Sequence, residues 1–150
     1  MRSSPAETTT KCSTVTKMRD ELRRHRAWFT GVVPSDRDHA AATRWLSQNT
    51  QPLLTTDYII DEILTLLKAR GQTLHAIVMG EQFFRGTLAT VYDLTEADIL
   101  LGWQTFRQFS DKAWGFTDCT SKVVIDKLHL QQAFAFDHHF HQFGSVEVAP

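Results

Sequence analysis

Apolar residues recur along the chain in short runs and in helical stripes, which predicts buried strands that alternate with amphipathic helices. Residues 52–56 are a short apolar run of the strand type, and residues 57–70 follow with their apolar positions on one helix face. Thr56 or Asp57 is a suitable cap for this helix, and Gly71 is a suitable end. A strand that leads directly into a capped helix is half of a strand–helix–strand unit.

The same alternation continues on both sides of this unit. We expect further helices at residues 35–49, 73–84, 95–109 and 117–130, a short helical turn at 137–144, and strands at 88–94, 132–136 and 145–150. Strands separated by helices of this length are typical of an α/β fold with a parallel sheet.

Capping and packing residues can be assigned to several of these helices. Thr95 and Thr117 are the expected N-caps of the helices that they open. In the helix at 35–49, we expect Ala41, Trp45 and Leu46 to face inward.

The composition is that of one ordinary globular domain. The 150 residues are 42% hydrophobic and 22% charged, which suits a single domain with a sizeable core. No apolar run reaches the roughly 18 residues that a membrane span needs, and residues 1–17 lack the apolar segment of a secretory signal. Cys12 and Cys119 have no metal-binding spacing. We therefore expect a cytoplasmic protein with no membrane contact, in which Cys119 is a small packing residue.

Basic residues concentrate near the N-terminus, although the net charge is only −1. The segment 17–26, KMRDELRRHR, is the most basic part of the chain. A short basic run is most often a solvated surface, and contact with nucleic acid or a partner protein is the alternative interpretation.

Three carboxylates stand in otherwise apolar surroundings. Glu62 flanks the apolar stripe of its helix, Asp118 comes in a first helical turn after an aromatic residue, and Asp137 follows the apolar run 133–136. Each has an ordinary explanation, as a surface acid, a partner of the helix dipole or a helix cap. In a parallel sheet, however, polar function gathers at the carboxyl ends of the strands. Three carboxylates that meet there would form a site for a hard divalent cation, as phosphoryl chemistry uses.

A cluster of histidines offers a different metal-site hypothesis. His138, His139 and His141 lie close together in the sequence, but they include no i, i+4 pair and have no cysteine near them. We interpret them as solvated histidines. Cys119 and Ser121 have no evident histidine–acid partners, so nucleophilic catalysis is not indicated.

Four segments together resemble a known family: AWFTGVVPSDRDHAAATRWL at 27–46, LLTTDYIIDEILTLLKARG at 53–71, DKAWGFTDCTSKVVIDKLHLQQAFAFDHHF at 111–140 and FGSVEVAP at 143–150. They are similar to PIN-domain proteins of the VapC toxin type. The resemblance implies a three-layer α/β/α fold with a parallel central sheet. It also implies cleavage of RNA phosphodiester bonds that depends on Mg²⁺ or Mn²⁺, a small antitoxin protein as partner, and a homodimer.

The acidic residues of this family fall on Glu62, Asp118 and Asp137. The resemblance gives them the roles of metal ligands and catalytic residues, and Ser121 is a further candidate to steady the site. Clustered carboxylates repel one another, and a divalent cation relieves that repulsion. The cation can lower the pKa of a bound water and stabilise charge on the scissile phosphate, and Mg²⁺ retains several waters as it does so.

The beginning of the chain departs from this family. The family's first strand ends in an acidic residue, whereas the corresponding residues here are RHRA at 24–27. We also expect segment 17–26 not to form a buried central strand, since its charges would need partners. Asp20 and Glu21 are nearby but poorly placed substitutes.

These departures divide the chain into an atypical, disordered or mis-framed segment 1–26 and a PIN-like domain at 27–150. Two explanations are open for segment 1–26. Either it comes from an altered reading frame or a wrong start, which the abrupt boundary at Ala27 favours, or the protein is a degenerate member of the family. Because an arginine in the metal site would repel the cation, we expect weak or no activity. The alternative function is a non-catalytic PIN-like module that binds an antitoxin-like protein or RNA. A third hypothesis, a flavodoxin-like domain for a small ligand, lacks a glycine-rich phosphate loop.

Overall fold

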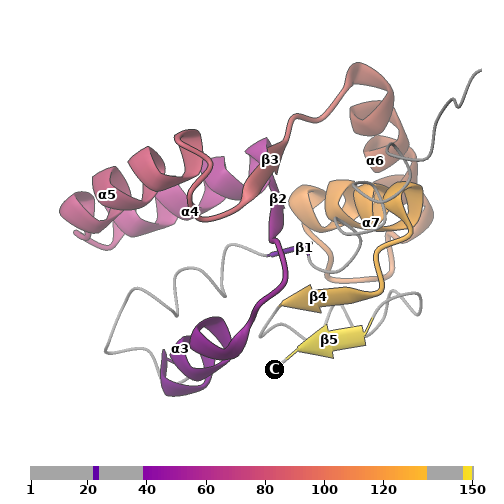
Figure 1. Ribbon diagram of the computed structural model, residues 1–150. Helices are drawn as coiled ribbons and strands as arrows, with labels where there is room; N and C mark the ends of the chain where they lie inside the picture. Colours follow the sequence, from indigo (N-terminus) through magenta and orange to yellow (C-terminus); the bar gives the residue numbers. More distant parts are fainter. Residues whose placement is uncertain (1–21, 24–38, 135–146, 150) are drawn as a thin grey trace, which may run out of the picture.

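The strands form one parallel sheet in the computed structural model, which describes residues 22–23, 39–134 and 147–149 (Figure 1). The strands are β1 (Leu22–Arg23), β2 (Leu54–Thr56), β3 (Thr90–Tyr92), β4 (Gln132–Phe134) and β5 (Glu147–Ala149). Their order across the sheet is β3-β2-β1-β4-β5, and each described neighbouring pair is parallel. The expected parallel sheet is confirmed, and the last strand, β5, lies at an edge of it.

The middle strand of the sheet comes from the basic segment near the N-terminus. Leu22 of β1 pairs with Leu54 of β2 on one side and with Ala133 of β4 on the other. The expectation that segment 17–26 contributes no central strand is therefore wrong, although a strand of two residues is short enough to be called disrupted. Backbone N–H and C=O groups make the pairing, so a charged segment can supply it. The sheet thus includes residues before position 26, and the proposed division there stays a prediction.

The helix after β2 begins where the sequence predicts. Thr56 caps α4 (Asp57–Ala69), and its Oγ1 accepts a hydrogen bond from Ile59 N at 3.2 Å. Gly71 has a φ of +73°, a conformation that suits glycine after a helix end. Ile59 and Ile63 are fully buried on the inner face of α4.

Two pairs of helices enclose the sheet. The other described helices are α3 (His39–Gln48), α5 (Thr73–Phe84), α6 (Glu96–Gln108) and α7 (Phe116–Leu128). α4 packs against α5 and α6 packs against α7, and Figure 1 shows β1, β2 and β3 between the two pairs, with β4 and β5 below α7. The three-layer α/β/α arrangement expected from the sequence is confirmed.

The start of α7 differs from the sequence expectation. Its N-cap is Gly115, and Thr117 lies inside the helix. The reason is the Asp118 carboxylate, whose Oδ2 accepts a hydrogen bond from Gly115 N at 2.8 Å and so fixes the first turn.

One inward position in α3 also differs. Ala42 is fully buried, whereas Ala41 is exposed. Trp45 and Leu46 pack against Ala42 as expected, because residues three and four positions apart share a helix face.

Cys119 has the packing role that its sequence context predicts. It is fully buried in the same core cluster as Val124 and Ile125. Burial raises the pKa of the Cys119 thiol, which disfavours the reactive thiolate.

Some predicted features lie outside the described residues. They include Asp137, the three histidines, the two substitute acids at 20 and 21, and Cys12. Among the helices that are described, none has the length and apolar character needed to cross a membrane.

Candidate functional site

Glu62 lies in the second turn of α4, at the border between its buried and exposed faces. Its neighbour Ile63 is fully buried and Asp61 is exposed. The side chain is half-buried, and its Oε2 atom is buried. The expected position beside the apolar stripe is thus the observed one.

Asp118 is more deeply placed than a surface acid at a helix start. It is only 2% exposed, and its Oδ1 atom is buried. Its Oδ2 atom accepts the bond from Gly115 N, which holds the carboxylate at the N-terminal end of α7. The helix dipole favours a negative charge at this end, and the burial takes the charge away from bulk water.

The turns that contain these two acids meet at one cavity. Tyr58 of α4 and Phe116 of α7 are in ring contact, with centroids 6.1 Å apart. A cavity of about 480 Å³ beside them is lined by Glu62 and by Thr117, the residue before Asp118; the other lining residues are Asp57, Tyr58 and Asp61. The structure therefore brings Glu62 and the first turn of α7 together, while Asp137 lies outside the described residues.

The oxygen atoms near this cavity suit a hard cation. Glu62 and Asp118 offer carboxylate oxygens, the donors that Mg²⁺ and Mn²⁺ prefer. Ser121, one turn after Asp118, is fully buried, and its Oγ has no hydrogen-bond partner among the described residues. Within the described part of the chain, no group of three histidine, cysteine, aspartate or glutamate side chains is arranged to hold a metal ion. A complete ligand set would need a residue beyond that part.

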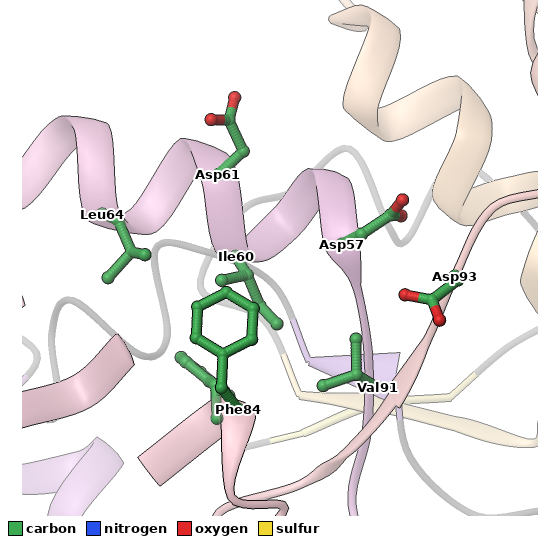
Figure 2. A pocket seen from close by; sticks show the side chains of 8 residues that line it. Asp57, Ile60, Asp61, Leu64, Phe84, Val91 and Asp93 are labelled. Carbon is green, nitrogen blue, oxygen red and sulfur yellow. The ribbon is translucent and has the colours of Figure 1, made fainter. Parts of the chain in front are cut away.

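A second cavity also adjoins the first turns of α4. Its volume is about 380 Å³, and Figure 2 shows Asp57, Asp61 and Asp93 around a floor of apolar side chains that includes Phe84. Asp57 lines both cavities. Its Oδ1 also accepts hydrogen bonds from Tyr58 N at 3.0 Å and Leu94 N at 3.3 Å, which ties α4 to the segment after β3.

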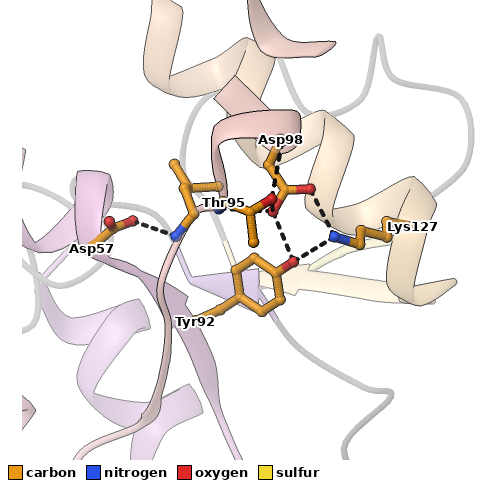
Figure 3. A network of polar contacts seen from close by, with 6 residues as sticks. Asp57, Tyr92, Thr95, Asp98 and Lys127 are labelled. Carbon is orange, nitrogen blue, oxygen red and sulfur yellow. Dashed lines mark hydrogen bonds and ion pairs between the residues drawn. The ribbon is translucent and has the colours of Figure 1, made fainter. Parts of the chain in front are cut away.

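One buried acid was missed as an organising residue by the sequence interpretation. Asp98 is 1% exposed and is the centre of the network in Figure 3. Its Oδ2 accepts bonds from Tyr92 Oη at 2.9 Å and from Thr95 N and Oγ1 at 3.1 and 2.8 Å. Its Oδ1 accepts a bond from Lys127 Nζ at 2.8 Å. The apolar periodicity of residues 95–109 does not indicate that Asp98 has hydrogen-bond partners on β3 and α7.

The network shifts the acidity of both charged groups. Burial by itself would raise the pKa of Asp98, but the hydrogen bonds from Lys127, Thr95 and Tyr92 hold it well below its usual range. The bonds to Asp98 and Tyr92 raise the pKa of Lys127 to about 12. Asp98 and Lys127 are therefore both charged at neutral pH. With Tyr92 of β3, they join β3, α6 and α7.

Comparison with known proteins supports one family. No model of a protein family matches the chain. The chain is 29% identical over 115 residues to the 23S rRNA-specific endonuclease VapC20 of two Mycobacterium tuberculosis strains, an alignment that covers 77% of this chain and 87% of the relative.

Solved structures agree with this similarity. The crystal structure of Mycobacterium tuberculosis VapC20, described as a sarcin-ricin loop cleaving toxin, has a TM-score of 0.81 at 25% identity and covers 87% of this chain and 100% of that one. FitAcB from Neisseria gonorrhoeae has a TM-score of 0.63 at 12% identity over 87% of this chain and 96% of that one, which shows a likeness of fold alone. In its sequence and its fold, the chain is similar to the PIN-domain proteins of the VapC toxin ribonuclease type.

Proposed function

We propose that the chain is a metal-dependent endoribonuclease and the toxin of a toxin–antitoxin pair. The observation that carries this proposal is the cavity shared by Glu62 and by Thr117, the neighbour of Asp118. The similarity to a 23S rRNA-specific endonuclease supports RNA as the substrate class.

The strand order supports the same location for the site. β1 lies between β2 and β4, and ligands of open α/β sheets bind beyond the carboxyl ends of the strands, where the strand order reverses. Glu62 belongs to the helix that follows β2, and Asp137 comes shortly after the end of β4 in the sequence.

We propose Mg²⁺ or Mn²⁺ as the cofactor, with Glu62, Asp118 and Asp137 as its ligands. When bound, such an ion supplies an activated water and stabilises negative charge on the phosphate. The chain's own residues hold the ligands in place: Gly115 N fixes one oxygen of Asp118, and the buried core beside α4 limits the motion of Glu62.

The partners follow from the same family assignment. We propose a small antitoxin protein that binds this chain, a homodimer as the assembled state, and the cytoplasm as the location. Each is consistent with a toxin that acts on RNA inside the cell that makes it.

A second candidate function is a non-catalytic PIN-like module that binds RNA or an antitoxin-like protein. The observation that favours it is the basic sequence RHR at 24–26, directly after β1, where the family resemblance calls for an acidic ligand. Because positive charge at this point would repel a divalent cation, we expect weak cleavage by this chain.

The first test is cleavage of 23S rRNA by the purified chain with Mg²⁺, with Mn²⁺ and with a chelator. Asp118→Asn should lower the cleavage rate on the order of 100-fold, as the loss of one charge-stabilising group does in other enzymes. The matched control is Asp126→Asn, because Asp126 is a partly exposed acid on the same helix whose ion pair with Lys122 lies on its surface.

Each outcome distinguishes the two candidates. Cleavage that needs the metal and is lost in Asp118→Asn alone supports the nuclease. A folded chain that binds RNA without cutting it under any condition supports the non-catalytic module. Equal cleavage by the wild type and Asp118→Asn would contradict the assigned site.

A further inference from the structure

Two aromatic side chains stand on the exposed face of α6. Trp103 is 50% exposed and Phe106 is 38% exposed. Their rings are stacked, with centroids 5.8 Å apart and planes 19° from parallel. Trp114, by contrast, is only 6% exposed and packs against Phe109 in the core. The α6 pair is therefore not part of the hydrophobic core.

The exposed pair continues toward the carboxylates through further ring contacts. Phe106 meets the edge of Phe116 at 6.2 Å, and Phe116 meets Tyr58 at 6.1 Å. We call Trp103, Phe106, Phe116 and Tyr58 the aromatic row. Tyr58 itself lines the cavity of Glu62, so the row leads from an open surface into the candidate site.

The charge at the inner end of the row limits what can bind along it. Asp57, Asp61 and Glu62 line the cavity there, and negative groups repel the phosphates of RNA unless a cation is present. Stacking of a base on an aromatic ring needs no positive charge and is how proteins hold unpaired RNA bases. The row thus offers the kind of contact that remains available to a nucleic acid beside acidic groups.

We propose that the aromatic row is a stacking subsite for unpaired bases of the RNA next to the cleaved bond, with Trp103 and Phe106 as its open platform. This inference rests on the proposed function, because it assigns the part of the substrate that the site holds. It makes the chain selective for loops and single strands over duplex RNA, whose bases are already stacked on one another.

The test is RNA binding without cleavage, measured by fluorescence anisotropy in EDTA. The probes are a short fluorescein-labelled single-stranded RNA and the same RNA annealed to its complement. Trp103→Ala combined with Phe106→Ala should weaken binding of the single strand about tenfold or more. Trp103→Phe, which keeps an aromatic ring at this position, should retain most of the wild-type affinity. Phe84→Ala is the matched control, since Phe84 is a 76% exposed ring on α5 that is outside the row.

Four outcomes decide the matter, with folding checked by circular dichroism. Weaker single-strand binding in the double variant, with unchanged binding in Phe84→Ala, supports the subsite. Equal binding by the wild type and the double variant overturns the subsite and leaves the nuclease intact. A double variant that keeps RNA affinity but loses self-association or antitoxin binding also overturns it and makes the row a protein interface. A folded wild type that binds neither RNA in EDTA overturns the subsite, whereas the proposed nuclease is decided separately by the cleavage assay with added Mg²⁺ or Mn²⁺.

Discussion

Asp98 is an acid whose effect on stability follows from its partners. It is almost fully buried and accepts four hydrogen bonds, one of them from a charged lysine. Asp98→Asn removes the charge and places amide hydrogens against donors, so we expect a loss of about 2 kcal/mol in the free energy of unfolding. Urea denaturation measures it. Asp126→Asn should cost less than about 0.5 kcal/mol, because its pair with Lys122 is partly exposed; equal losses would contradict the network's importance.

The same network predicts how stability depends on pH. The folded-state pKa of Asp98 lies below its ordinary value of 3.8, so its contribution is complete above that pH and is lost as the pH falls below it. The pKa of Lys127 is raised from 10.5 to about 12, so its contribution is complete below 10.5 and is lost between 10.5 and 12. The difference in unfolding free energy between the wild type and Asp98→Asn should thus be flat between these limits and shrink beyond both. A difference that changes near neutral pH would exclude this assignment.

At the scale of elements, two helical glycines differ in the space around them. A Cβ atom at Gly102 of α6 would lie 2.7 Å from Thr120 Cγ2 of α7, and Thr120 is held by its hydrogen bond to Thr117 O. A Cβ at Gly80 of α5 would lie 3.5 Å from Leu64 Cδ1, an ordinary contact. Gly102→Ala should therefore destabilise the protein by about 1–2 kcal/mol, whereas Gly80→Ala should be neutral or stabilising by up to about 1 kcal/mol. Thermal unfolding of the two variants checks the contrast, and a stable Gly102→Ala variant would show that α6 and α7 can separate at little cost.

The elements also show what the sequence could and could not predict. α4 and α6 were predictable because Thr56 and Thr95 cap them locally. β1 was not predictable, because its side-chain pattern does not indicate a strand, whereas its backbone pairs with β2 and β4. Asp98 was missed for a related reason: Lys127 lies 29 residues away in sequence and Tyr92 is on another element. For the candidate site, the positions of Glu62 and Asp118 agree with the sequence interpretation, while their role as metal ligands stays a prediction.

For the whole molecule, the sheet explains why distant segments line one cavity. Glu62 belongs to α4, which follows β2, and Asp118 belongs to the first turn of α7, which precedes β4. The two acids are therefore far apart in the sequence. Glu62 and Thr117, the residue before Asp118, line a common cavity because α4 and α7 both begin at the same edge, where Tyr58 and Phe116 touch. The aromatic row extends that edge across α6, so the surface near the carboxylates is built from both helix pairs.

The position of β1 has a consequence for the order in which the molecule can assemble. Of the described strands, β1 is the first to leave the ribosome, yet its neighbours are β2 and β4, and the Leu22–Ala133 pairing joins segments 111 residues apart in the chain. β2 and β3 are consecutive among the described strands, with only α4 and α5 between them, and can pair early, whereas β4 and β5 are made last. Contacts of such large sequence separation form slowly because their loops must close first. The sheet can therefore form completely only after translation is nearly finished. Until then, β1 cannot pair with β4, and the two halves of the sheet stay unconnected.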